Sequence, residues 1–239
     1  MLRKTPSAHF IGRCLSLLLG SVLITASPTA PAVQLSSNGV GQVLLFPYYV
    51  SRGNNDTLIS ITNHSHQVKA LKLRVLEGDN GRPIRGINLY LAPFDSWSAS
   101  ISEGADGPRI HSNDLGCAVP VVNQLPLNLD ALNSAPDDGR QSIDRAREGY
   151  LEVIEMGVVN DNGLGRFARV TGINPPRIEC GPIRGAWLTS DGIWRQNAQT
   201  DLQPPDGQLS AQAVIINVPL ARAVAYSATL TFLNGRVQT

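Results

Sequence analysis

Two histidines separated by one residue, His64 and His66 in "NHSHQ", are spaced in a way that could support chemistry. On a β-strand, side chains two residues apart lie on one face, so the two imidazoles could supply half of a metal site. Their neighbours are polar and turn-forming, and no acidic residue or cysteine is placed beside them to complete the ligand set. The pattern therefore predicts a solvated turn, and the sequence predicts no metal and no other cofactor.

Carboxylates are the next candidates, because hydrolysis often depends on a pair held at a defined separation across a cleft. Glu152 and Glu155 in "LEVIE" fall on opposite faces if this segment is a strand, and Glu103 and Asp106 lie beside glycines in a loop. The chain also lacks a G-x-S-x-G nucleophile motif. These observations predict a protein that is not an enzyme, and they leave a secreted hydrolase as the weaker alternative.

Aromatic side chains could bind a glycan or another ligand by stacking. Trp187 and Trp194 flank the turn-forming residues 190–192, and Tyr48 precedes Tyr49 on a predicted strand, where successive side chains face opposite sides. We therefore expect one tyrosine ring in the core and the other exposed. Core packing is the simpler interpretation of all these rings, and Trp187, Trp194 and Tyr48 are the candidates for ligand stacking.

The first 32 residues have the composition of a signal peptide. A basic start is followed by the apolar run Cys14–Ala26, which is too short to span a bilayer, and Ala30-Pro31-Ala32 fits a small-x-small cleavage site. We therefore expect cleavage near Ala32 and export to the periplasm, the cell surface or the medium.

The mature chain would carry 17 basic and 19 acidic residues. A chain this close to neutrality has no global field for nucleic acid, and no later apolar run is long enough for a membrane span. Cleavage also removes Cys14, which leaves Cys117 and Cys180 as one pair. In an oxidising compartment this pair predicts one disulfide closing a loop of about 64 residues, whereas a redox or metal role would require C-x-x-C spacing or neighbouring histidines.

Alternation of apolar and polar residues is the dominant structural signal. In "SWSASIS" four serines alternate with Trp97, Ala99 and Ile101, which is typical of a strand with one buried face. Similar runs form two blocks, the second including "EGYLEVIEMGVV", "GRFARVTG", "AQAVIINVPL" and "AVAYSATLTFL". The patterns predict a mainly β fold, an Ig-like antiparallel β-sandwich formed by residues 33–239 as a single domain. Two small tandem sandwiches are the less favoured alternative, because each block has few strands.

Two segments interrupt this alternation, at about residues 104–147 and 174–209. Both are rich in Gly and Pro, with Asn and Asp in the first, and each contains one of the two cysteines, so we expect long irregular insertions tied together by the disulfide. Within the first, "QSIDRARE" predicts one short helix with Ser142 as its N-cap.

Several segments, taken together, resemble an uncharacterised family of exported proteobacterial β-rich proteins. They are "GQVLLFPYY", "NDTLISITN", "LEGDNG", "NLYLAPFDSWSASI", "EGYLEVIEMG" and "IINV", spread over about residues 41–218. The resemblance implies a bacterial, exported, β-rich protein and carries no activity, cofactor or catalytic residue with it. Members of the family run longer after the "IINV" strand, so the resemblance leaves open whether the last sheet is complete here, and an unpaired edge strand would invite a partner.

These observations lead to one principal expectation about function. We expect an exported, non-catalytic β-sandwich that acts as a structural or interaction module of the bacterial cell envelope or surface, with a protein partner. The alternative is a module that binds a glycan or another ligand.

Overall fold

Alternating side chains produce the strands that the sequence predicts. In β6 (Ser96–Gly104), Trp97, Ala99 and Ile101 are buried, while Ser96 and Ser98 face solvent. The computed structural model describes residues 33–127, 139, 142–172 and 177–233. The predicted signal peptide, residues 1–32, lies outside the described residues.

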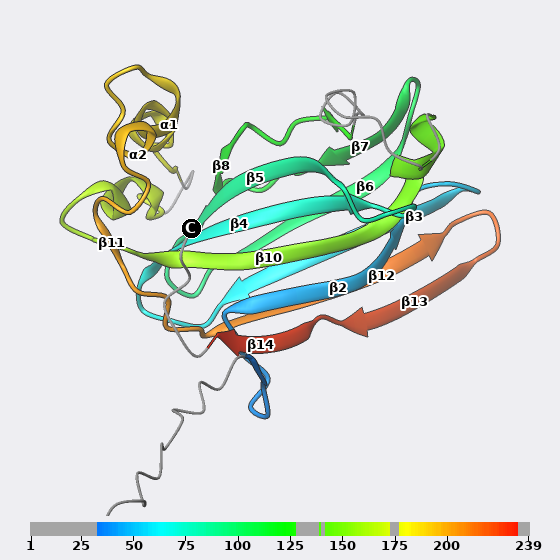
Figure 1. The fold of residues 1–239 in the computed structure, drawn as a ribbon, viewed down its shortest axis with the longest axis horizontal. Coiled ribbons are helices and arrows are strands. Elements are labelled where there is room, and N and C mark those ends of the chain that lie inside the picture. The colour runs from blue at the N-terminus through cyan, green and yellow to red at the C-terminus, as the bar shows by residue number, and fades with distance from the viewer. Residues whose placement is uncertain (1–32, 128–138, 140–141, 173–176, 234–239) are drawn as a thin grey trace, which may run out of the picture. The chain divides into compact units, whose positions relative to one another are not determined.

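The strands form two antiparallel sheets (Figure 1). The first sheet contains, in spatial order, β1 (Val33–Leu35), β14 (Thr229–Leu233), β2 (Val43–Val50), β10 (Glu148–Val159), β4 (Val68–Glu77), β5 (Pro83–Leu91) and β8 (Cys117–Val119), with β11 (Leu202–Gln203) paired to β10. The second contains β13 (Arg222–Ser227), β12 (Leu209–Asn217), β3 (Asn55–Asn63), β6, β7 (Gly107–His111) and β9 (Leu125–Pro126).

The main core lies between the two sheets. Phe46, Leu73 and Val153 from the first sheet belong to the same buried cluster as Ile59 and Trp97 from the second. Residues two apart on each strand point to this shared side, and burial of their apolar surface is the dominant favourable contribution to folding. The prediction of a mainly β, antiparallel sandwich with irregular insertions is thereby confirmed.

A bulge in β2 sets the faces of its aromatic residues. Tyr49 pairs with Gly149 and Phe46 pairs with Leu151, so β2 contains one more residue than β10 over this interval. The extra residue allows Phe46 and Tyr49, three positions apart, both to be buried, while Tyr48 is 42% exposed. The expected division into one core tyrosine and one exposed tyrosine is confirmed.

A second, smaller core covers one end of the outer face of the first sheet. It combines Val68 and Tyr90 from β4 and β5 with Ile183 from α1 (Gly181–Leu188) and Trp194 from α2 (Ile193–Gln196). The segment 174–209 is therefore not only a loop: its two short helices bury side chains that the sandwich core cannot reach. Within the part of the chain described, no helix has the length and apolar character needed to cross a membrane.

Three local predictions have different outcomes. The helix in "QSIDRARE" is η2 (Ile143–Arg147), a 3₁₀ helix in which the Ser142 side chain accepts from the Asp144 backbone N–H, as expected. The strand predicted in "GRFARVTG" is wrong, because this segment begins with η3 (Leu164–Ala168), a 3₁₀ helix packed in the second core. The run "AVAYSATLTFL" is two strands, because the chain passes from one sheet to the other at Ala228.

Two buried ion pairs lie inside the sandwich. The Glu77 carboxylate accepts from Arg145 Nε and Nη2, each at 3.0 Å, and from three backbone N–H groups of the β4–β5 turn. At the other end of β4, Lys69 Nζ lies 2.9 Å from Glu155 Oε1, and both side chains are inaccessible to solvent. Buried charges require such partners, because loss of hydration is costly.

Candidate functional site

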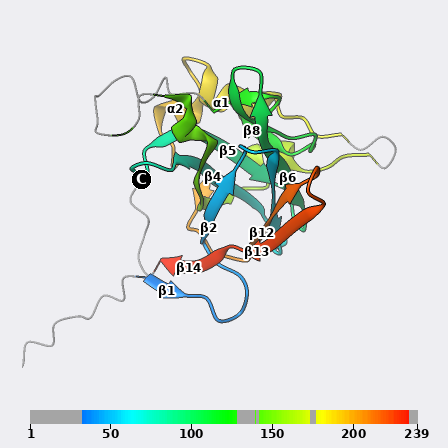
Figure 2. The ribbon, with the colours of Figure 1, turned by 90° about the vertical axis from the view of Figure 1, so that its right-hand side faces the viewer.

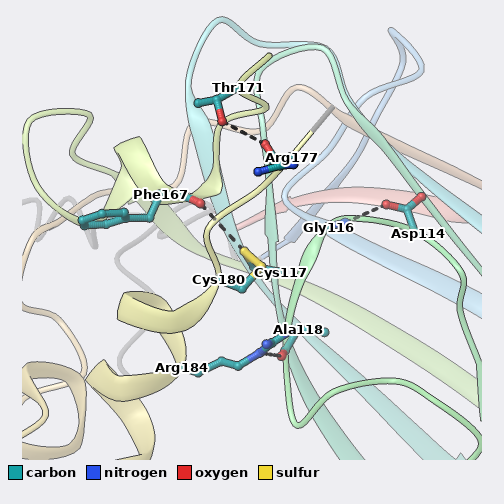
Figure 3. Close-up of a disulfide and its surroundings, with 9 residues drawn as sticks. All are labelled: Asp114, Gly116, Cys117, Ala118, Phe167, Thr171, Arg177, Cys180 and Arg184. Carbon is teal, nitrogen blue, oxygen red and sulfur yellow. Dashed lines mark hydrogen bonds between the residues drawn. A yellow bond between two sulfur atoms is a disulfide. The ribbon is translucent and has the colours of Figure 1, made fainter. Parts of the chain in front are cut away.

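The predicted disulfide is present. Cys117 in β8 and Cys180, which precedes α1, form an S–S bond of 2.04 Å with their Cα atoms 5.3 Å apart. Figure 3 shows the bond joining the strand to the start of the helix. Because β8 is the last strand of its sheet, the disulfide holds this sheet edge against the second core.

The two tryptophans proposed for ligand stacking occupy the second core instead. Trp194 is 2% exposed, and its ring stacks on Tyr90 with centroids 5.1 Å apart. Trp187 is partly buried beside it, and its indole Nε1–H donates to the Tyr90 hydroxyl. Trp194 therefore packs in a core, which was the simpler interpretation of its sequence, and the alternative of ligand stacking does not fit a ring buried between protein side chains.

The contact between Trp187 and Tyr90 predicts a measurable stability effect. Burial raises the pKa of the Tyr90 hydroxyl, and Trp187→Phe would remove the donor bonded to that hydroxyl. We expect the free energy of unfolding, measured by urea denaturation, to fall by about 1–2 kcal/mol. Adding Tyr90→Phe to this variant removes the hydroxyl that has lost its donor, and it should recover part of the lost stability. A single variant as stable as the wild type would contradict the packing role of Trp187.

Tyr48, the third stacking candidate, has an exposed ring whose hydroxyl is hydrogen-bonded within the protein. Its Oη donates to Glu148 Oε2 at 3.0 Å, and Arg52 Nη2 binds the same carboxylate. Burial, followed by the hydrogen bond and charge of Glu148, raises the pKa of Tyr48. The three stacking candidates do not form one site, because Tyr48 lies in β2 whereas the tryptophans cover the far side of β5.

The groups that hydrolysis would require occur only in part. His64 Nε2 lies 2.7 Å from Ser210 Oγ, a contact that sequence spacing did not reveal because the residues are 146 positions apart. The His64 side chain is exposed, and no described carboxylate binds its ring. A groove of about 740 Å³ contains Asp56, Glu103 and Asp144, and two of these three carboxylates, Glu103 and Asp144, bind Arg147. These arrangements lack the third group of a catalytic triad and a free pair of carboxylates.

The His, Cys, Asp and Glu side chains that could bind a metal ion lie apart in the described part of the chain. Among residues 33–127, 139, 142–172 and 177–233, no group of three His, Cys, Asp or Glu side chains gathers closely enough to hold a metal ion. His66 lies edge-on to the Phe94 ring, with centroids 4.5 Å apart.

The outer strands of the two sheets differ greatly in length. In the described part of the chain, the strands at the ends of the two strand orders are β1 and β8 in the first sheet and β13 and β9 in the second, and the two-residue β11 pairs only with β10. β1 and β8 have three residues each and β9 has two, one of them Pro126, whereas β13 has six. Short strands and proline are two ways in which proteins prevent edge pairing. β13 has neither protection, so it is the candidate interaction edge.

The side chains of β13 are exposed on both faces. Val224 is 63% exposed, and the neighbouring Ala223 and Ala225 are also open to solvent. Arg222 is the only charged residue of the strand, and the hairpin turn before it exposes Val218 and Leu220. β13 pairs with β12 on one side, and no other described strand pairs with it. Figures 1 and 2 show β13 along one border of the sandwich.

The edge is held in place from within the fold. β12 and β13 pair over six positions, from Gln212–Ser227 to Asn217–Arg222. Near the end of β13, the Tyr226 hydroxyl donates to the backbone carbonyl of Tyr48 in β2. These contacts fix the position of β13, so the backbone N–H and C=O groups on its outer side have a defined geometry. In the sequence, "AVAYS" is a short β-prone run without internal charge or proline, a pattern that predicts a strand but not its place at the edge of a sheet.

Comparison of the chain with protein-family models, with curated proteins and with solved structures finds no match.

Proposed function

We propose that the protein is an exported, non-catalytic interaction module of the bacterial cell envelope or surface, and that its partner binds by adding a β-strand to β13. The observation that carries the proposal is the contrast among the four outer strands, of which only β13 is both long and unprotected. In strand addition, main-chain hydrogen bonds supply affinity and alternate side chains supply specificity.

The composition of the edge indicates the kind of partner. Ala223 and Ala225 leave one face of β13 with small apolar side chains, and Val224 offers a larger exposed apolar contact on the other face. A matching partner strand would carry aliphatic side chains and no proline at its pairing positions. The uncharged stretch after Arg222 favours a neutral segment over a strongly charged one.

Photo-crosslinking in whole cells tests the proposal. Benzoylphenylalanine at position 224 is expected to form a specific adduct recovered from the envelope fraction, whereas the same residue at position 188 should not. The two positions are matched, since Val224 is 63% and Leu188 64% exposed. The mass of the adduct distinguishes a second copy of the chain from a different protein.

A charged variant provides the control for strand pairing. With the crosslinker moved to Leu220, Val224→Lys should abolish the adduct, because lysine on an edge strand opposes pairing and the exposed site tolerates it in the fold. Equal adducts at positions 224 and 188, or an adduct unaffected by Val224→Lys, would contradict the proposal.

A further inference from the structure

A cavity of about 410 Å³ lies at the edge of the sandwich opposite to β13. Its walls come from the loop between β7 and β8 (residues 112–116), from residues 121–123 and from the start of α1 beside the disulfide. This volume lies within the range of about 300–1,000 Å³ typical of small-ligand sites. The cavity shares no lining residue with the interaction edge.

The apolar part of the cavity is aliphatic. Leu115 and Val121 line it and are 54% and 52% exposed, although large aliphatic side chains are usually more buried. The one aromatic residue in the lining, Trp97, is 1% exposed and belongs to the main core. The cavity therefore offers contacts for an aliphatic group and no exposed ring on which a sugar could stack.

Among the described residues that line the cavity, Arg184 is the only one with a basic side chain. Its Nε donates to the Ala118 carbonyl at 3.5 Å, as Figure 3 shows, and no described carboxylate lies within ion-pair distance of its guanidinium. Elsewhere in the protein, Arg74 and Arg147 bind carboxylates directly. A guanidinium has five N–H donors in a planar fork that matches a carboxylate, so Arg184 has donors available for an anionic ligand.

Asp114 places a negative charge on another wall of the cavity, apart from the positive charge of Arg184. Its Oδ1 accepts from the Gly116 backbone N–H at 2.9 Å, and Figure 3 shows it well apart from Arg184. A ligand that fits both walls has a carboxylate at one end and N–H donors at the other.

We propose that this cavity binds the C-terminal end of a short peptide. Its carboxylate binds the Arg184 guanidinium, an aliphatic side chain packs against Val121 and Leu115, and its backbone N–H groups face Asp114. The site is independent of the proposed strand pairing, because β13 lies at the other edge of the sandwich.

Calorimetric titration of the purified protein with N-acetyl-Ala-Leu tests the inference. We expect saturable binding, and we expect N-acetyl-Ala-leucinamide, which lacks the terminal charge, to bind at least about tenfold more weakly. Arg184→Gln should weaken binding of the acid by a similar factor. Arg195→Gln is the matched control, because Arg195 is exposed on α2 and outside the cavity lining, and it should bind like the wild type.

Thermal unfolding of each variant establishes that it is folded before binding is compared. Equal affinity for the acid and the amide, unchanged binding by Arg184→Gln, or no binding of either peptide would overturn the inference. Glucuronic acid is the third probe, and tighter binding of this sugar acid than of the peptide would overturn the assignment to a peptide. Val224→Lys should leave peptide binding unchanged, so failure here is distinguishable from failure of strand pairing.

Discussion

Replacing Glu77 with leucine is expected to lower the free energy of unfolding by about 3–5 kcal/mol. The Glu77 side chain is inaccessible to solvent, and its carboxylate binds both Nε and Nη2 of Arg145, which is 1% exposed. Leucine would leave the guanidinium in the interior without this negative charge and would also leave three backbone N–H groups of the β4–β5 turn without their acceptor. Urea denaturation at neutral pH measures the loss.

A second ion pair in the same sheet supplies the control. Glu152 and Arg74 also join β10 to β4, at 2.8 Å, but their side chains are 21% and 36% exposed. Glu152→Leu should therefore cost no more than about 1 kcal/mol. If the two leucine variants differed from each other by less than that amount, burial would not be what makes the Glu77 pair important.

The pH dependence of stability gives the same pair a separate signature. Burial would raise the pKa of Glu77, but the hydrogen bonds from Arg145 and the turn N–H groups hold it below its ordinary value. A carboxyl with a lowered folded pKa contributes stability that is present above its unfolded pKa, about 4.3, and lost as pH falls through the folded value. The stability of Glu77→Leu should therefore fall less than that of the wild type below about pH 4.

Replacing both Cys117 and Cys180 with alanine is expected to cost about 4 kcal/mol. The disulfide joins residues 63 positions apart, so it removes many conformations from the unfolded chain. It also joins β8, a strand of only three residues, to the start of α1, and both cysteines lie in the second core. Urea denaturation under non-reducing conditions should show the loss directly.

Reduction of the wild-type protein provides the comparison. Dithiothreitol should lower the stability of the wild type towards that of the double variant and should leave the variant itself unchanged. A double variant within about 1 kcal/mol of the oxidised wild type would mean that the unfolded chain is already compact in this region.

Local patterns predicted those parts of the fold that depend on local physics. The alternation in Ser96–Gly104 indicated a strand with one buried face, and the spacing of Ser142 before "IDRAR" indicated a capped turn of helix. Both predictions are confirmed because side-chain direction and N-capping are set by neighbours in the chain. The disulfide followed from counting, since the expected cleavage near Ala32 removes Cys14 and leaves two cysteines, which can pair in only one way.

Contacts between residues far apart in the chain could not be predicted from the sequence. Trp194 follows a turn, and its sequence allowed either core packing or ligand stacking, but no local pattern indicated that its ring stacks on Tyr90, more than 100 positions away. The alternation in "AVAYSATLTFL" continues across Ala228, so it did not reveal that the chain changes sheets there. For the same reason, nothing local identified β13 as an outer strand, because the position of a strand in its sheet depends on every other pairing.

The pairing of β1 with β14 has a consequence for how the protein is made. Val33 lies opposite Leu233, so the first and last described strands pair in the same sheet. On its other side, β14 pairs with β2. A growing chain cannot form these contacts until β14 has left the ribosome, and contacts this distant in sequence are slow to form. Until then β2 lacks its neighbour on that side, and the apolar run "VLLF" within it can associate with other chains. Chaperone demand during synthesis should therefore concentrate on β2.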